Sequence, residues 1–217
     1  MSDDPETARQ IAALAMGARP LLVCDVDDVL LEFVRPFMAW LETQGMELKT
    51  DSFKLTGNIR ARGTGAVAPQ EEVSALLAGF FDAQADWQQP AAGALDTLGA
   101  LDETIDIVLL TAMPHRHYGA RLTTLERHGI AYPLITTEMA KGPAVKALRG
   151  DPGRRVAFID DIPHNHVSVA ADVPDAGCIH LASHEGLAAV MPPLPDGVRK
   201  ARDWPHAGDL IAELLGL

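Results

Sequence analysis

Cysteine and positive charge are scarce in this sequence. Only two cysteines occur among the 217 residues, Cys24 and Cys178, each inside an apolar run. Buried reduced thiols are therefore expected, and not a disulfide. Lysine and arginine number 18 against 30 aspartates and glutamates, which gives a net charge of -12. Such a chain repels nucleic-acid backbones and offers no basic face to an anionic membrane, so neither is expected as a partner.

Long apolar runs are also missing. No stretch is apolar over the length that spans a bilayer, and the acidic start MSDDPETARQ lacks the basic segment and apolar run of a secretory signal. We therefore expect a cytoplasmic protein. With 217 residues, 47% of them hydrophobic, the chain can form one sizeable core with a smaller appended unit.

Carboxylates follow directly after an apolar run in the stretch LLVCDVDDVL, residues 21–30. The run suits a short strand buried on both faces. Side chains alternate along an extended chain, so Asp25 and Asp27 project from the same side of the strand's end. Like charges this close raise each other's proton affinity unless a cation or hydrogen-bond donors hold them ionised. The pattern therefore favours a hard metal ion such as Mg²⁺.

Helical and strand patterns alternate from Pro90 onward. Apolar runs predict strands at 105–110, 132–136, 155–159 and 176–181, the last of these closing the sheet. Helical spacing predicts helices at about 95–101, 118–129 and 142–149, and a terminal helix from Pro205. This alternation predicts an α/β fold with a mostly parallel sheet covered by helices on both faces. Ligands of such sheets bind at the carboxyl ends of the strands.

Residues 33–89 interrupt the alternation after the first strand. Aromatic residues at helical spacing begin at Phe33, and a second helix is expected from about Pro69 to Gln84. Between these helices lies the glycine-rich segment LTGNIRARGTG, expected to be a mobile loop. We interpret residues 33–89 as a small helical cap inserted into a core formed by residues 1–32 and 90–217.

Three predicted strands end in reactive side chains. In a parallel sheet these endings lie at one edge, and the start of the helix before the third strand adds an ammonium group nearby. The arrangement suits phosphoryl transfer: one aspartate attacks phosphorus, another exchanges a proton, a hydroxyl and an ammonium hold the oxygens, and an acidic pair anchors a metal. The residues concerned are Asp25, Asp27, Thr111, Lys141, Asp160 and Asp161.

These motifs, in this order, resemble those of the haloacid dehalogenase-like (HAD) superfamily, specifically its aspartate-nucleophile phosphatases. The match runs from about residue 20 to residue 181 and implies a Rossmann-like core with a cap that closes on the substrate. By this resemblance Asp25 is the nucleophile that forms an aspartyl-phosphate, Asp27 the general acid/base, Thr111 the phosphate-binding hydroxyl and Lys141 the lysine of the third motif. The resemblance further implies Mg²⁺ held by Asp25, Asp27 through its backbone carbonyl, Asp160 and Asp161.

Two positions distinguish this chain within the family. Members that cleave carbon–halogen bonds lack the acid/base aspartate, whereas this sequence has Asp27. Many members have glycine next, where this chain has Asp28. Aspartate tolerates the turn conformations that glycine favours, so the turn is expected to form.

Several further residues are candidates for binding the substrate. Arg60 and Arg62, in the glycine-rich segment, suit the clamping of an anion, although both also fit a solvated surface. Ala112 and His115 follow Thr111 closely and are expected at the same edge of the sheet. Lys146 is an alternative to Lys141, but it lies a turn further into the helix.

The histidines form two groups, PHRH at 114–117 and PHNH at 163–166. Either they are ordinary loop and helix-start residues, or one or two of His115, His117, His164 and His166 contact the leaving group or a second metal. Asn165 could orient a metal ligand.

The sequence thus predicts a Mg²⁺-dependent hydrolase of a small phosphorylated metabolite. A phosphotransferase of the same family, a receiver-like signalling module and a non-catalytic binding protein remain alternatives. In a receiver-like module, however, the acidic pair lies on the first strand and no cap interrupts the fold. The substrate's identity and the choice between a monomer and a homodimer stay open.

Overall fold

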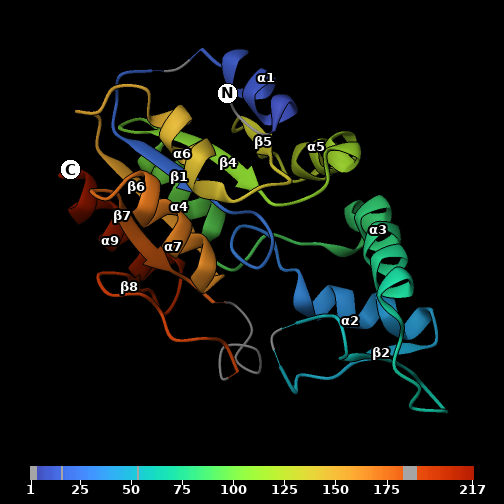
Figure 1. The fold of residues 1–217 in the computed structure, drawn as a ribbon. Helices are drawn as coiled ribbons and strands as arrows, with labels where there is room; N and C mark the ends of the chain where they lie inside the picture. Colours follow the sequence, from blue (N-terminus) through green and yellow to red (C-terminus); the bar gives the residue numbers. More distant parts are fainter. Residues whose placement is uncertain (1–3, 16, 53, 183–189) are drawn as a thin grey trace.

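The computed structural model describes residues 4–15, 17–52, 54–182 and 190–217. Its centre is a six-stranded parallel sheet with the strand order β5-β4-β1-β6-β7-β8 (Figure 1). The strands are β1 (Leu21–Cys24), β4 (Asp106–Thr111), β5 (Leu134–Thr136), β6 (Val156–Asp160), β7 (Gly177–His180) and β8 (Arg199–Lys200). Because β1 pairs on both sides and is covered on both faces, all four of its residues are buried, which explains its continuous apolar sequence.

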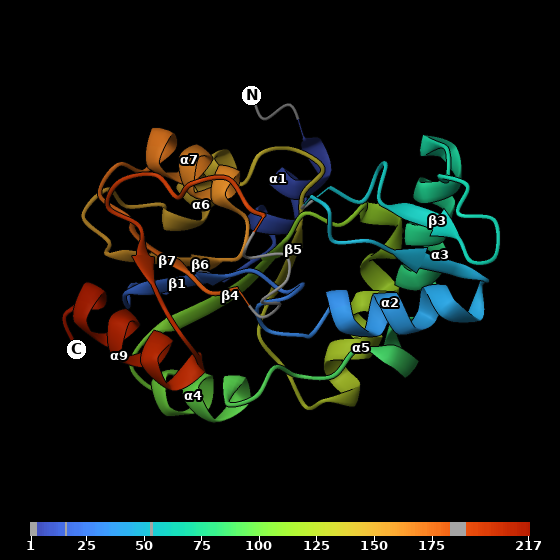
Figure 2. The same cartoon turned by 90° about the horizontal axis from the view of Figure 1, so that it is seen from below.

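Helices cover both faces of this sheet (Figure 2). On one face lie α4 (Ala94–Leu101) and α9 (Trp204–Leu215), where Leu98 and Ile211 pack against Leu22 and Ile107. On the other lie α1 (Pro5–Ala12), α6 (Lys141–Arg149) and α7 (Pro163–Asp172). The α/β class predicted from the alternating pattern is confirmed.

The segment predicted as a cap has its own hydrophobic cluster. It contains α2 (Val34–Thr43) and α3 (Gln70–Trp87), whose Phe37, Trp40 and Phe80 form an aromatic group. Met191, beyond the predicted cap, packs against the same cluster. The boundaries 33–89 themselves stay a prediction.

Some elements differ from the expectations. The glycine-rich segment is not only loop: its Ile59–Ala61 (β3) pairs antiparallel with Met46–Leu48 (β2). The helix α7 and the short strand β8 were not predicted, so β7 is not the last strand of the sheet. The helix α5 (Tyr118–Arg127), preceded by the short 3-10 helix η1 (His115–His117), lies beside α3, with Arg127 Nη1 donating to the Ala85 carbonyl at 2.7 Å.

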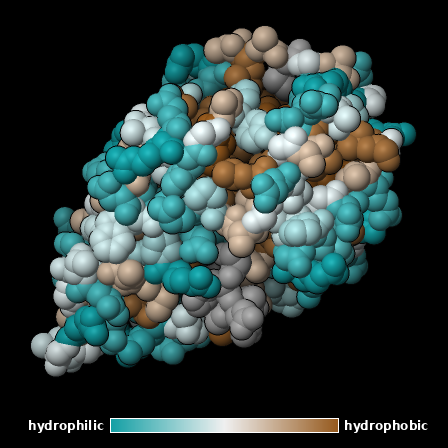
Figure 3. All heavy atoms as spheres, turned by 180° about the vertical axis from the view of Figure 1, so that it is seen from behind, coloured by the Kyte–Doolittle hydropathy of each residue, from teal (hydrophilic) through white to brown (hydrophobic). Residues whose placement is uncertain are grey.

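The surface carries few large exposed apolar side chains. Among the described residues they are Val67, Leu95, Met139, Val167 and Leu217, and they come from separate elements. In the view from behind, hydrophobic atoms form several groups separated by hydrophilic ones (Figure 3). No helix in the described part of the chain combines the length and apolarity of a membrane span.

Candidate active site

A cavity of about 250 Å³ lies where the carboxyl ends of β1, β4 and β6 meet the segment of α2 and α3. Its polar lining comes from the ends of these strands and the helices that follow them: Asp25, Asp27, Asp28, Thr111, Lys141, Asp161 and Asn165. The parallel sheet brings these groups to one edge, as the sequence predicts. Of the six residues predicted to perform chemistry, five line the cavity, and Asp160 lies directly behind it.

Lys141 connects two of the carboxylates. Its Nζ lies 2.6 Å from Oδ1 of Asp25 and 2.7 Å from Oδ2 of Asp160, and all three side chains are buried. Burial alone would lower the pKa of Lys141, but the charges of Asp160 and Asp25 raise it above its usual value. Lys141 is therefore a permanent cation. Lys146 is exposed on α6 and does not line the cavity.

Asp27 is held by donors from three different elements. Arg121 Nη2 donates to its Oδ1 at 2.7 Å and to its Oδ2 at 2.9 Å. Gln88 Nε2 donates to Oδ1 at 3.0 Å, and Thr111 Oγ1 donates to Oδ2 at 3.3 Å. One fifth of the Asp27 side chain remains exposed, at 20%. The carboxylate is thus fixed in orientation but open to a ligand in the cavity.

Three carboxylates are close enough to share a cation. Oxygens of Asp25, Asp160 and Asp161 lie within 4.8 Å of one another, and all three residues are buried. Both oxygens of Asp160 already accept hydrogen bonds, from Lys141, Asn165 and the Ile162 amide. Asp161 accepts no hydrogen bond from the described residues. In this cluster the carboxylate of Asp161 and the second oxygen of Asp25 are the oxygens that accept no hydrogen bond from the described residues, and Asp160 keeps its place in the predicted ligand set.

The balance of charge at this cluster is negative. Burial raises the pKa of Asp25 to about 7, with the charges of Asp160 and Asp27 adding to the shift against the attraction of Lys141. Burial also raises the pKa of Asp161 well above its usual range, as do the charges of Asp160 and Asp25. One lysine does not compensate these carboxylates. An oxygen-only donor set with excess negative charge fits a hard divalent cation such as Mg²⁺.

Asp28 forms the turn that follows the first strand. Its φ of 60° is the left-handed conformation that glycine favours. Its Oδ1 accepts hydrogen bonds from the amides of Phe33 and Val34, at 2.9 and 3.1 Å, where α2 begins. Aspartate thus adds a helix cap that glycine could not provide.

The predicted substrate-binding residues are dispersed. Ala112 lines the cavity. Arg60 and Arg62 do not; they lie on or next to β3 and form weak ion pairs with Asp51, at 3.5 Å, and Glu42, at 3.4 Å. The two arginines therefore do not line the cavity, and their role as a clamp on the substrate stays a prediction.

None of the four predicted histidines lines the cavity. His115 contacts Asp4, 2.9 Å from its Nε2, and Thr136, 2.7 Å from its Nδ1. His117 contacts Asp82 of α3, and His164 is exposed. His166 is buried beside the Asp160 carbonyl. The placement favours the structural interpretation of both groups.

Arg121 and Gln88 were missed by the sequence analysis. Arg121 is fully buried on α5. A signal was present: Arg121 falls on the same helical stripe as Tyr118, Leu122 and Leu125, where a charge is out of place. Gln88, directly after α3, carried no such signal.

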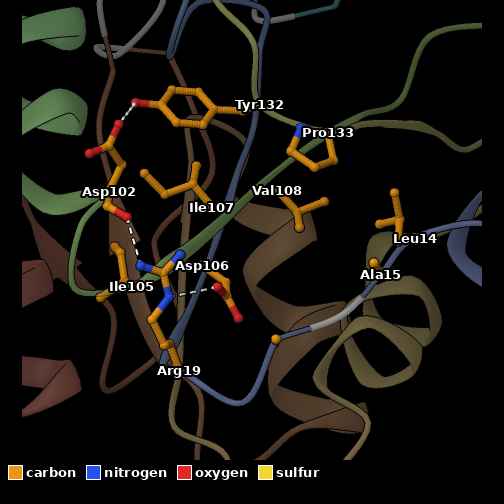
Figure 4. Close-up of a pocket in the computed structure, with 11 residues that line it drawn as sticks. Leu14, Ala15, Arg19, Asp102, Ile105, Asp106, Ile107, Val108, Tyr132 and Pro133 are labelled. Carbon is orange, nitrogen blue, oxygen red and sulfur yellow. Dashed lines mark hydrogen bonds and ion pairs between the residues drawn. The ribbon is translucent and has the colours of Figure 1, made fainter.

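A second cavity, of about 290 Å³, lies at the opposite edge of the sheet, around the start of β4 (Figure 4). Its polar groups bind one another: Arg19 pairs with Asp106 at 2.9 Å, and the Tyr132 hydroxyl donates to Asp102 at 3.3 Å. These groups are satisfied within the protein, so this cavity is a weaker candidate for a reactive site than the first.

The sheet order, the helices on both faces and the reactive strand ends define a fold shared with solved HAD-superfamily hydrolases. The chain is similar to a HAD hydrolase of family IA, variant 3, from Entamoeba histolytica, with 12% identity, coverage of 88% of this chain and 99% of that chain, and a TM-score of 0.60. It is similar to a predicted phosphoglycolate phosphatase from Haemophilus somnus (15% identity, 90% and 99% covered, TM-score 0.58). It is also similar to the HAD-hydrolase YfnB from Bacillus subtilis bound to magnesium (15% identity, 93% of this chain and 100% of that chain covered, TM-score 0.59).

No protein-family model and no curated protein matches the chain. At the identities above, the similarity establishes the fold, and the resemblance predicted from the motifs is confirmed at that level.

Proposed function

We propose that this chain is a Mg²⁺-dependent phosphatase that hydrolyses a small phosphate monoester through an aspartyl-phosphate on Asp25. One observation supports this above all: a buried carboxylate, Asp25, lies 2.6 Å from a buried lysine in a cavity that also contains Asp27, Thr111 and Asp161. Nucleophile, proton carrier and phosphate-binding groups are thus available in one place.

In the first step an oxygen of Asp25 attacks phosphorus, and the bond from phosphorus to the ester oxygen breaks. Asp27 gives a proton to the departing oxygen, so the product leaves as an alcohol. In this proposal Lys141 and the Thr111 hydroxyl hold the phosphoryl oxygens. In the second step Asp27 takes a proton from water, the water oxygen attacks phosphorus, and phosphate leaves with the Asp25 carboxylate restored.

Asp25, Asp161 and the backbone carbonyl of Asp27 would hold the divalent cation. When bound, it would supply positive charge to the carboxylates and to the phosphoryl oxygens. Asp160, the third carboxylate of the cluster, would join them, and its oxygens also accept hydrogen bonds from Lys141 and Asn165. A magnesium-bound structure among the similar proteins supports the choice of metal.

The test is hydrolysis of a panel of phosphate monoesters with Mg²⁺ and after chelation with EDTA. We expect Mg²⁺-dependent release of phosphate from at least one small monoester, and a loss of at least about a thousandfold in kcat for Asp25→Asn, because the nucleophile is removed. Asp51→Asn is the matched control, since the side chain of Asp51 is 70% exposed on the cap segment. Full activity of Asp25→Asn would contradict the proposal.

Two further measurements separate the alternatives. Mass spectrometry of protein quenched in acid during turnover should find a phosphorylated Asp25. Transfer of phosphate to added alcohols or sugars, in preference to water, would identify a phosphotransferase instead.

A further inference from the structure

Part of the lining of the catalytic cavity is apolar. It is formed by side chains at the start of α2, before β3, on α3 and near the C-terminal part of the chain: Phe33, Val34, Leu55, Leu77, Phe81 and Met191. Phe33, Leu55 and Leu77 are partly exposed, so their surface is available to a ligand. We call these six residues the apolar wall.

Aromatic packing fixes the position of this wall. The ring of Phe33 lies 5.4 Å from those of Phe37 and Phe80 and 6.0 Å from that of Phe81, measured between centroids. Behind the wall, Phe37 and Phe80 are fully buried. A ligand would therefore meet a surface that is already ordered, and binding there costs little additional entropy.

Cations are almost absent from the cavity. Among the described lining residues Lys141 alone is positively charged, against Asp25, Asp27, Asp28 and Asp161. Lys141 is itself within 2.7 Å of two carboxylates. Arg60 and Arg62, the cap arginines expected to clamp an anion, instead pair with acidic groups outside the cavity.

We propose that the substrate is a monoester of a single phosphate whose leaving group is uncharged and largely apolar. This inference rests on the phosphatase activity proposed above. A second phosphate or a carboxylate on the leaving group would lose its hydration against the apolar wall, whose six residues offer it no cation or side-chain hydrogen-bond donor. The volume of about 250 Å³ lies just below the range of ligand pockets, roughly 300–1,000 Å³, so the leaving group is small.

Normal alkyl phosphates from ethyl to hexyl test the apolar wall directly. Their alkoxide leaving groups have nearly the same intrinsic reactivity, so differences between them report contact with the wall. We expect kcat/KM to rise about fourfold per added methylene until the wall is covered, which corresponds to the burial of one methylene group. A matched phosphate that ends in a carboxylate, 5-carboxypentyl phosphate, should react at least about tenfold more slowly than hexyl phosphate.

A charge placed on the wall should change this preference. Leu77→Lys adds an ammonium group to the apolar wall, and we expect it to reduce the ratio of hexyl to 5-carboxypentyl phosphate turnover by about tenfold or more. Ala75→Lys is the control, because Ala75 is exposed on the same helix and does not line the cavity. It should leave the ratio unchanged.

Measuring the binding of phosphonates, which are not hydrolysed, tests the apolar wall independently of the proposed phosphatase activity. Calorimetry with hexylphosphonate and 5-carboxypentylphosphonate, in the presence of Mg²⁺, reports the wall without any hydrolysis. Tighter binding of hexylphosphonate with no turnover of any ester would overturn the phosphatase proposal and support the apolar wall. Turnover that is independent of chain length, or faster with the charged ester, would overturn the wall and leave the phosphatase proposal standing.

Discussion

At the scale of single residues, Arg121 is the least expected member of the site. Its side chain is fully buried, Nη2 donates to both oxygens of Asp27, and Nε and Nη1 have no hydrogen-bond partner among the described residues. Leaving buried donors unpaired costs about 1–3 kcal/mol each. We explain the burial of Arg121, despite these unpaired donors, by the two hydrogen bonds with which its Nη2 orients Asp27.

Arg121→Met should therefore impair both stability and turnover. Removing one partner of a buried ion pair costs about 3–5 kcal/mol, and because Asp27 is partly exposed we expect the lower end of that range. Urea denaturation measures it. The control Arg127→Met, also on α5, breaks an exposed ion pair with Asp86 of α3 and a hydrogen bond to the Ala85 carbonyl, and should cost only about 1 kcal/mol.

The kinetic readout distinguishes orientation from stability. If Arg121 positions Asp27, the loss in kcat/KM, which reports the first step alone, should be larger for hexyl phosphate, which needs a proton on its leaving oxygen, than for 4-nitrophenyl phosphate, which does not. Arg121→Lys should recover part of that difference. Equal losses on both substrates would show that Arg121 serves only the fold.

The strand-end residues were predictable, and the residues that support them were less so. Asp25, Thr111 and Asp161 follow apolar runs, and the geometry of a parallel sheet requires such endings to meet. Arg60 and Arg62 were candidates because a glycine-rich segment suggested mobility. In the structure two of its glycines, Gly63 and Gly65, have positive φ values just after β3, so glycine there serves chain geometry and not ligand binding.

At the scale of elements, the turn from β1 into α2 depends on Asp28. Its left-handed φ of 60° strains most side chains, while its Oδ1 holds two amides at the start of α2. Glycine would remove the strain but lose the cap. Alanine would lose the cap and also be strained in the left-handed conformation. Asparagine tolerates that conformation and keeps a side-chain oxygen that can accept the two hydrogen bonds.

The expected order of stability is thus Asp28→Asn, then Asp28→Gly, then Asp28→Ala. The alanine variant should lose about 2–3 kcal/mol, from about 1 for the cap and about 1–2 for the left-handed conformation. Thermal unfolding of the three variants checks the order. An alanine variant as stable as the asparagine variant would show that neither the cap nor the conformation matters.

Elements with strong periodicity were predicted, and short or weakly patterned ones were not. The apolar stripes of α3 and α9 predicted two helices, and the apolar run of β1 predicted a buried strand. The strands β2, β3 and β8 contain at most three residues each, which is too short for alternation to be recognised. The helix α7, PHNHVSVAAD, exposes Val167 and buries His166, so tertiary contacts and not an apolar stripe determine it.

At the scale of the whole molecule, stability and metal binding should be linked through the buried carboxylates. The pKa of Asp25 is raised to about 7 and that of Asp161 well above its usual range, chiefly by burial. An unfolded aspartate titrates near ~3.9. Between these values the folded protein retains protons that the unfolded chain has lost, so these two groups reduce stability as pH rises from about 4 through 7.

Two buried histidines act in the opposite direction. Burial lowers the pKa of His180 to about 4 and lowers that of His166. The unfolded chain therefore binds more protons at these positions below about pH 6.5, and their contribution to stability rises with pH. The contribution of Asp161 to the pH dependence of stability must consequently be separated from that of the histidines. Comparison with Asp161→Asn does this, because asparagine at position 161 does not titrate.

Thermal melts at pH 5 and pH 8, with EDTA or with Mg²⁺, test the linkage in full. Because Mg²⁺ binds the ionised carboxylates, its stabilisation should be small at pH 5 and larger at pH 8, about 2.7 kcal/mol at a concentration one hundred times Kd. In EDTA, wild type should lose stability relative to Asp161→Asn between pH 5 and 8, and that variant should show a much smaller Mg²⁺ effect. Asp51→Asn should behave as wild type. A Mg²⁺ shift of equal size at both pH values would contradict the assignment of a metal to Asp25 and Asp161, since the site would then not compete with protons.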